Sequence, residues 1–139
     1  MMGMTSVLCF TGVLLFLLGL VTGFAIPALK APRIGLSAHL AATQMGVALI
    51  AFGFLWERLT FWNGWSAPLA HSLWISFYVV WAAILLGGFW GTGKSLPIAG
   101  AGHVATKLQE RITLLPLVLG SVATFVVIVL ILIQWRWKA

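Results

Sequence analysis

The sequence predicts an all-α integral membrane protein, in which one domain covering residues 1–139 forms a bundle of four transmembrane helices. Hydrophobic residues make up 62% of the chain and charged residues only 7%, whereas soluble proteins average about 45–50% and about 25%. Four apolar runs are each close to the roughly 20 residues that a helix needs to cross about 30 Å of hydrocarbon. Only helices and closed barrels satisfy their backbone hydrogen bonds in lipid, so runs of this length are expected to be helices.

The first apolar run is expected to be a helix over residues 5–26. Pro27 ends it, because proline has no amide hydrogen to continue the hydrogen-bond ladder. Gly19 and Gly23 have the small-x-x-x-small spacing that lets two membrane helices approach closely. The run therefore predicts a helix that packs tightly against a neighbour along its glycine face.

The second run, residues 36–56, carries His39 near its start. Ser37 is expected to be the N-cap, which places His39 in the first turn after a loop over residues 28–35. An ionisable residue within a membrane helix is costly and is a candidate for function, and imidazole is the commonest metal ligand. His39 is therefore a candidate ligand for iron or zinc. The alternative is a histidine that bonds a lipid headgroup or a backbone carbonyl.

The third and fourth runs, residues 69–90 and 112–134, differ in polarity. The third carries His71 and Tyr78, which share a helical face. They predict either a base and a donor that line a substrate pocket or an interfacial histidine and a tyrosine bonded to a neighbouring helix. The second half of the fourth run is almost purely Val, Ile and Leu and is expected to face lipid or to pack generically. His103, in the loop between the two runs, is expected to be solvated.

The formal net charge of +6 does not indicate a nucleic-acid partner, because the basic residues lie singly or in pairs beside apolar runs, as headgroup anchors do. The first and third loops hold five of them and the other end holds three. This favours termini outside, by a difference too small to fix the orientation. The eight are Lys30, Arg33, Arg58, Lys94, Lys107, Arg111, Arg136 and Lys138.

Acidic residues are almost absent, because the chain has no Asp, and its two Glu, Glu57 and Glu110, fall at the expected membrane edges. A hydrolase with paired carboxylates is therefore not expected. Nor is a four-helix multidrug antiporter, which needs a carboxylate inside the bundle. Cys9 is the single cysteine, so a cysteine-based metal site is not expected either.

Four further residues near His39 are candidates for a site. Gln44 is expected to orient a ligand or to bond across helices, and Met45 to be a soft ligand or a packing residue. Lys30 and Arg33 precede His39 and would suit the propionates of a haem. The alternative for both cations is simple headgroup anchoring.

Two segments carry a family resemblance: residues 32–40, which read PRIGLSAHL and are followed by Gly46, and residues 89–94, which read FWGTGK. Both resemble the hydroxylaminobenzene mutases, small four-helix membrane enzymes that rearrange an aryl hydroxylamine into an ortho-aminophenol. These enzymes are distantly similar to the styrene oxide isomerases. The resemblance implies a homotrimer that binds ferric haem b through His39 as axial ligand and takes a small aromatic substrate. We expect it in the bacterial inner membrane.

The resemblance also implies that the iron acts as a Lewis acid toward a substrate oxygen, and Tyr78 matches a substrate-contacting tyrosine of the epoxide isomerases. Two positions depart from those isomerases, which have asparagine in place of Met45 and aspartate in place of Ala70. We therefore expect an aryl hydroxylamine mutase. The alternatives are an epoxide isomerase, a non-catalytic haem-binding membrane subunit, or a structural protein without a cofactor.

Overall fold

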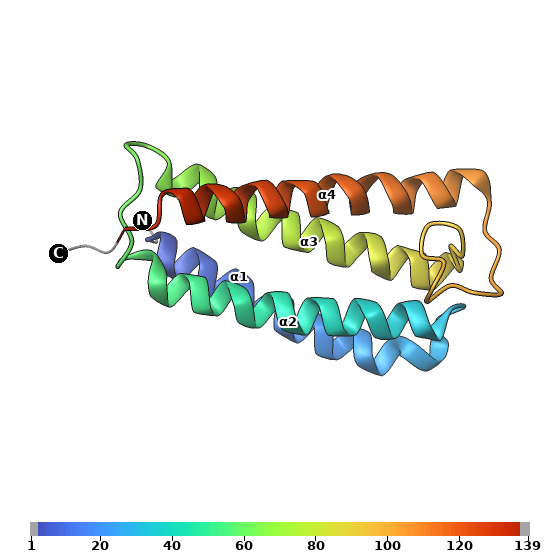
Figure 1. The fold of residues 1–139 in the computed structure, drawn as a ribbon. Coiled ribbons are helices and arrows are strands. Elements are labelled where there is room, and N and C mark those ends of the chain that lie inside the picture. The colour runs from blue at the N-terminus through green and yellow to red at the C-terminus, as the bar shows by residue number, and fades with distance from the viewer. Residues whose placement is uncertain (1–2, 137–139) are drawn as a thin grey trace.

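The computed structural model describes residues 3–136, which form four long helices and no strand (Figure 1). All four helices are long and apolar enough to cross a membrane, which confirms the predicted fold class. Lys138 lies outside the described residues. The helices are α1 (Met4–Ala25), α2 (Pro32–Trp56), α3 (Ser66–Trp90) and α4 (Lys107–Ile133), and a short 3-10 helix, η1 (Ile26–Ala28), follows α1.

Helix α2 begins at Pro32, four residues before the predicted start. Proline is well tolerated in the first helical turn, where its missing amide hydrogen has no intrahelical acceptor. The predicted N-cap at Ser37 is wrong: Ser37 lies within α2, and its hydroxyl donates to the carbonyl of Arg33 at 3.1 Å. His39 consequently lies about two turns into the helix instead of in its first turn.

Helices α3 and α4 also begin earlier than the apolar runs that predicted them, at Ser66 and Lys107. For α4 the reason is a capping box, in which the Thr106 hydroxyl accepts from the amide of Gln109 and the Gln109 side chain accepts from the amide of Thr106. The cap satisfies backbone amides of the first turn that have no partner within the helix. The polar first turn of α4 therefore belongs to the helix although it lies outside the apolar run.

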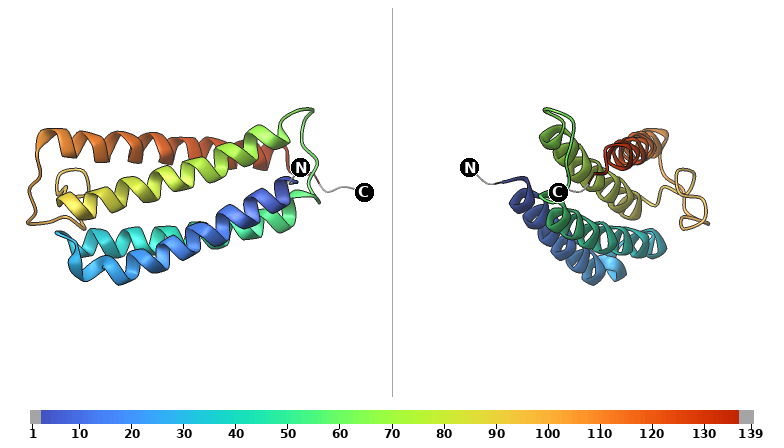
Figure 2. Two further views of the ribbon diagram at one scale, coloured as in Figure 1. Left: turned by 180° about the vertical axis from the view of Figure 1, so that it is seen from behind. Right: turned by 60° about the vertical axis from the view of Figure 1, so that its left-hand side comes forward.

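The four helices are arranged as two antiparallel pairs, α1 with α2 and α3 with α4 (Figures 1 and 2). The first and last described residues lie at the same end of the bundle, as an even number of spans requires (Figure 1). At that end, the amide of Thr60 donates to the carbonyl of Arg136 at 2.9 Å. At the other end, the amide of Ala31 donates to the carbonyl of Gly88 at 3.0 Å, which ties α2 to α3.

The α1–α2 pair is held by backbone-to-backbone approach at glycines. A Cβ added at Gly12 would lie 2.7 Å from the carbonyl oxygen of Gly46, and one added at Gly46 would lie 2.7 Å from the amide nitrogen of Phe16. A Cβ at Gly19 would lie 3.0 Å from the amide nitrogen of Thr43. The predicted close packing of the α1 glycine face is therefore confirmed, and its partner is α2.

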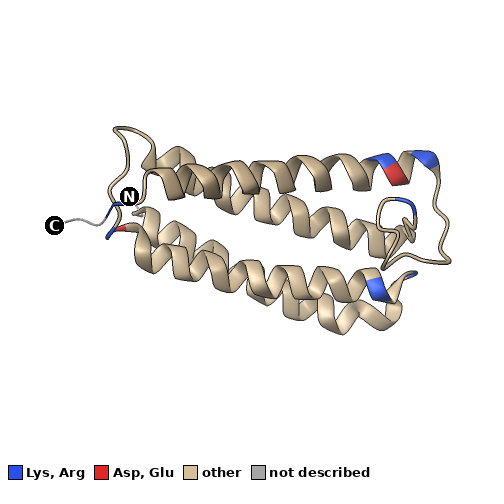
Figure 3. Ribbon diagram, in the orientation of Figure 1, with Lys and Arg blue, Asp and Glu red and all other residues tan. Residues whose placement is uncertain are grey.

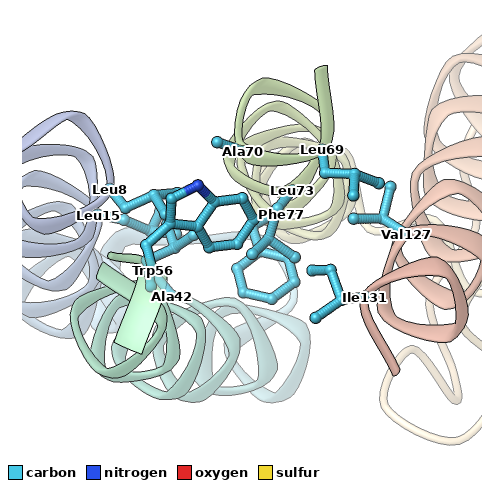
Figure 4. Close-up of a cluster of buried hydrophobic side chains, with 11 residues drawn as sticks. Leu8, Leu15, Ala42, Trp56, Leu69, Ala70, Leu73, Phe77, Val127 and Ile131 are labelled. Atoms are coloured by element: carbon cyan, nitrogen blue, oxygen red, sulfur yellow. The ribbon is translucent and has the colours of Figure 1, made fainter. Parts of the chain in front are cut away.

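Two clusters of buried apolar side chains join the two pairs, and Figure 4 shows the larger one. Leu8 and Leu15 of α1 and Leu73 of α3 are fully buried in it. From α4, Ile131 reaches the cluster while Leu132 beside it is 62% exposed, so the apolar second half of α4 contributes to the core with one face and presents the other outward. The outward face is stable only in an apolar solvent.

Candidate functional site

His39 lies on the flank of α2 that packs against α1, not in the middle of the bundle. It is half-buried, and its Nδ1 atom is 2.7 Å from the carbonyl oxygen of Gly19. A carbonyl only accepts hydrogen bonds, so Nδ1 carries the hydrogen and donates it. The ring also lies directly over Gly23, because a Cβ added there would be 2.9 Å from Nδ1 and 3.1 Å from Cε1.

The remaining ring nitrogen of His39, Nε2, points away from α1. Nδ1, Cε1 and Cγ are the ring atoms nearest to Gly23, so Nε2 lies on the edge of the ring farther from Gly23. Nε2 forms no hydrogen bond within residues 3–136, nor is it among the buried polar atoms without a partner. A neutral imidazole with a hydrogen on Nδ1 has its lone pair on Nε2. His39 therefore presents a nitrogen that can ligate a metal at the side of the bundle.

Gln44 and Met45 share α2 with His39 but lie on other faces. Five and six residues correspond to turns of about 140° and about 120° around the helix axis. Gln44 is exposed and lines a shallow outward-facing groove of about 370 Å³ together with Phe16, Thr43 and Val47. The hydroxyl of Thr43 donates to the carbonyl of His39 at 3.0 Å, so this groove begins one turn from the imidazole.

Met45 instead faces the interior, where it packs against both apolar clusters of the bundle. Ala70 is fully buried in the larger of these clusters. Met45 and Ala70, the two positions that set this chain apart in the sequence analysis, are therefore interior positions. An amide or a carboxylate at either would need partners that an apolar interior does not supply.

Lys30 and Arg33 lie at the same membrane edge as His39 but are engaged differently. The ammonium of Lys30 donates to the carbonyl of Val104 at 3.0 Å, which fastens the α1–α2 connection to the α3–α4 loop. Arg33 is exposed, and its guanidinium forms no hydrogen bond or ion pair with any residue from 3 to 136. Of the two cations, Arg33 is the one whose charge is free for an external anion.

Tyr78 contacts α1 at a different level from His39. Its hydroxyl donates to the carbonyl of Thr11 at 2.8 Å, eight residues before the Gly19 carbonyl that His39 contacts, or about 12 Å along a helix. The tyrosine ring lies edge-on to Trp74 and Trp81, at centroid distances of 5.7 and 6.4 Å. Trp74, Tyr78 and Trp81 therefore form a row of contacting aromatic rings on α3, which we call the aromatic ladder. Tyr78 is not brought together with His39.

Trp81, at the end of this ladder, comes closer to the level of His39. Its indole donates to the hydroxyl of Thr22 at 3.3 Å, and Thr22 in turn donates to the carbonyl of Leu18 at 2.7 Å. Thr22 is buried next to Gly23 in sequence. Composition alone gave no signal for this threonine, because its role depends on the indole that reaches it from another helix.

The other two histidines have no part in a shared site. His71 is exposed and accepts a hydrogen bond from the Trp74 indole at 3.1 Å. His103, which was expected to be solvated, is partly exposed, and its Nδ1 atom is buried and has no partner within the described chain. The loop folds back on itself here: the amide of Gly100 donates to the carbonyl of Leu96 at 2.7 Å, and that of His103 to the carbonyl of Gly100 at 3.0 Å.

Glu110 organises this loop and is the one acid at its end of the bundle (Figure 3). Its buried carboxylate accepts hydrogen bonds from the amides of Lys94 and Ser95 at 3.2 and 2.8 Å and from the Ser95 hydroxyl. Five of the basic residues gather at this end, as the loop counts predicted (Figure 3). The charge of Glu110 is thus used to hold the loop and not to bind a metal.

Protein side chains alone do not assemble a metal centre in residues 3–136, where no three His, Cys, Asp or Glu side chains come together. A cavity of about 470 Å³ lies at the opposite end of the bundle from His39. It is lined by residues that include Thr5, Glu57 and Trp62 and by none of the predicted site residues. The candidate site is therefore the outward-facing imidazole of His39 with the groove beside it.

Comparison with known proteins agrees with this membrane architecture. The sequence profile described as styrene oxide isomerase matches residues 4–136, nearly the whole chain. The chain belongs to the styrene oxide isomerase family. It is 40% identical over 122 residues to hydroxylaminobenzene mutase HabB of Ectopseudomonas oleovorans, an alignment that covers 87% of this chain and 74% of that protein.

A second relative, hydroxylaminobenzene mutase HabA of the same organism, is 39% identical over 110 residues, which cover 78% of this chain and 82% of HabA. Membership of this family makes the chain an integral membrane enzyme of the isomerase and mutase class. This confirms the expected family and the expectation of an enzyme, and it argues against a non-catalytic membrane subunit.

Proposed function

We propose that this isomerase rearranges an aryl hydroxylamine into an ortho-aminophenol, with haem b held by His39. The observation that carries the substrate class is the 40% identity to a hydroxylaminobenzene mutase over most of both chains. The net reaction breaks the N–O bond, forms a C–O bond at the ortho carbon and moves one ring proton to nitrogen. It is an isomerisation and needs no external oxidant or reductant.

The residues around His39 fit a haem better than a bare metal ion. A porphyrin brings four nitrogen donors of its own and needs one protein ligand, which matches a lone imidazole with a free Nε2 and no neighbouring cluster of donors. Metal-bound histidines usually donate their other ring N–H to a carbonyl or carboxylate, as Nδ1 does toward Gly19. When bound, ferric haem would supply a Lewis-acid position for the substrate oxygen.

The remaining residues near His39 support that group and keep water away. Phe16 and Val47 give the neighbouring groove apolar walls, which suit an aromatic substrate and limit hydrolysis of reactive species. Thr43 and Gln44 are the polar groups that line it and would orient the substrate nitrogen. Arg33, with no partner of its own within the described residues, would pair with a propionate at the membrane edge.

The outward orientation of His39 makes the proposed site incomplete in one copy of the chain. We expect two further copies of the chain, which make a trimer by family resemblance, to cover the group and the groove. The exposed apolar residues of this flank, among them Val13 at 58% and Leu17 at 53% exposure, suit contact with a second copy as well as with lipid. Helical spans are typical of the bacterial inner membrane, because outer-membrane proteins are β-barrels, and we expect the enzyme there.

Epoxide isomerisation is the second candidate, because the family itself is described by styrene oxide isomerase. Met45 and Ala70 stand where those isomerases have asparagine and aspartate, which favours the hydroxylamine substrate. The two activities are separated by offering phenylhydroxylamine and styrene oxide to the same purified protein. We expect 2-aminophenol from the first and little or no phenylacetaldehyde from the second.

The haem is tested on protein purified after expression with ample haem supply. We expect a Soret band in the wild type, loss or displacement of that band in His39→Ala, and loss of product formation in the same variant. His71→Ala is the matched control, since His71 is exposed and bonds only its neighbour Trp74. Colourless wild-type protein that still forms 2-aminophenol would overturn the haem but keep the substrate. A coloured protein that forms no product would overturn the reaction.

A further inference from the structure

The contact between α1 and the imidazole of His39 is more specific than helix packing requires. At Gly46 an added Cβ would meet backbone atoms of the opposing helix, and at Gly12 it would meet backbone atoms and the side chain of Ile50. At Gly23, the three nearest atoms would all belong to the His39 ring, at 2.9, 3.1 and 3.5 Å. The missing side chain at Gly23 therefore leaves room for one particular imidazole, and not for a second backbone.

The space over Gly23 is what lets the ring reach the Gly19 carbonyl. The hydrogen bond from Nδ1 to that carbonyl is short, at 2.7 Å, and Gly23 lies one helical turn after Gly19 on the same flank of α1. Because the carbonyl cannot donate, it selects the tautomer with hydrogen on Nδ1. It also points the Nε2 lone pair toward the side of the bundle.

We propose that Gly23 is a positioning residue, whose lack of a side chain seats the His39 ring on the Gly19 carbonyl and so fixes the tautomer and aim of Nε2. The proposal rests on the proposed function only in giving Nε2 a ligand to bind. The seat, by which we mean the contact of the His39 ring with Gly23 and with the Gly19 carbonyl, is a property of the protein without haem. Gly19 supplies the acceptor through its backbone, so Gly23 is the position at which a side-chain change can disturb the seat selectively.

The test is the tautomer of His39 in haem-free protein, read from ¹⁵N-histidine NMR in detergent under mildly alkaline conditions. His39→Gln identifies the signals of His39 among the three histidines. We expect wild-type protein to show hydrogen on Nδ1, and Gly23→Ala to shift His39 to a mixture of tautomers or to hydrogen on Nε2. Gly3→Ala is the control, since its Cβ would meet nothing closer than Glu57 at 4.0 Å.

The possible results distinguish the proposed role of Gly23 from the proposed haem-dependent function. A wild-type ring with hydrogen on Nε2 overturns the proposal without any variant, and so does a folded Gly23→Ala protein with unchanged His39 signals. If Gly23→Ala does not fold, the wild-type tautomer still tests the contact between Nδ1 and the Gly19 carbonyl, and hydrogen on Nε2 would overturn the proposal. With haem added, Gly23→Ala is expected to bind it about 10- to 100-fold more weakly, the range for loss of a partner that orients a ligand. Wild-type protein that binds no haem but shows the expected tautomer overturns the proposed cofactor and leaves the seat standing.

Discussion

Replacing Gly46 with alanine should force α1 and α2 apart. The new Cβ would lie 2.7 Å from the amide nitrogen of Phe16, 2.8 Å from the carbonyl oxygen of Gly12 and 3.0 Å from the Cα of Phe16. Ordinary contacts of this kind begin at 3.4 Å, so the helices must separate by about 0.7 Å at this level. Backbone atoms cannot rotate out of the way, and the whole interface is affected.

A gap of 0.5–1 Å forfeits roughly a quarter to a half of the attraction between packed atoms, and over-packing typically costs about 1–3 kcal/mol. Inside a membrane, helices associate largely by such packing, because lipid removes the hydrophobic drive between them. We therefore expect Gly46→Ala to lower the free energy of unfolding by about 2–3 kcal/mol, the upper part of that range.

The assay is reversible unfolding in mixed micelles, followed by helical circular dichroism. Val47→Leu is the matched control, because Val47 is the next residue of α2 and is 54% exposed. It should stay within about 0.5 kcal/mol of the wild type. A Gly46→Ala protein as stable as the control would refute the reasoning that backbone contact holds the α1–α2 pair.

Two further predictions concern polar contacts. Glu110→Ala should leave the amides of Lys94 and Ser95 without their acceptor, while the Ser95 hydroxyl keeps the backbone carbonyl of residue 110. We expect this to destabilise the loop by about 1–3 kcal/mol. Faster hydrogen exchange at the Ser95 amide measures this, and Glu57→Ala at an exposed position should not cause it. Tyr78→Phe should cost about 0.5–1.5 kcal/mol by removing the bond to the Thr11 carbonyl. Equal unfolding curves for the two proteins would contradict that role. A fall in turnover in the folded variant would support the predicted contact with substrate.

The functional predictions differ in how far the structure carries them. His39 was singled out because an ionisable group in an apolar run needs a reason, and the structure gives it an anchored Nδ1 and a free Nε2. The alternative of a histidine bonded to a backbone carbonyl describes Nδ1, and the alternative of a metal ligand stays a prediction for Nε2. The roles of Gln44, Met45, Lys30, Arg33 and Tyr78 stay predictions, and the structure spreads these residues over several faces.

Composition and the spacing of apolar residues determined that this chain is a four-helix membrane protein, because the length of an apolar run reports directly on the hydrocarbon it must cross. The same counting placed the starts of α2, α3 and α4 too late. At α4 the reason is a polar first turn that a capping box stabilises. The motif around His39 was enough to predict the family. Each of these properties is local in the sequence.

Only the tertiary structure decided which carbonyl His39 bonds, which glycine makes room for its ring, and on which side of the bundle Nε2 lies. Gly19 and Gly23 are about twenty residues from His39 along the chain, and their spacing predicted close packing without saying against what. The relative rotation of α1 and α2 sets that partner, and it follows from packing along the whole length of both helices. The residues around any one position do not determine this rotation.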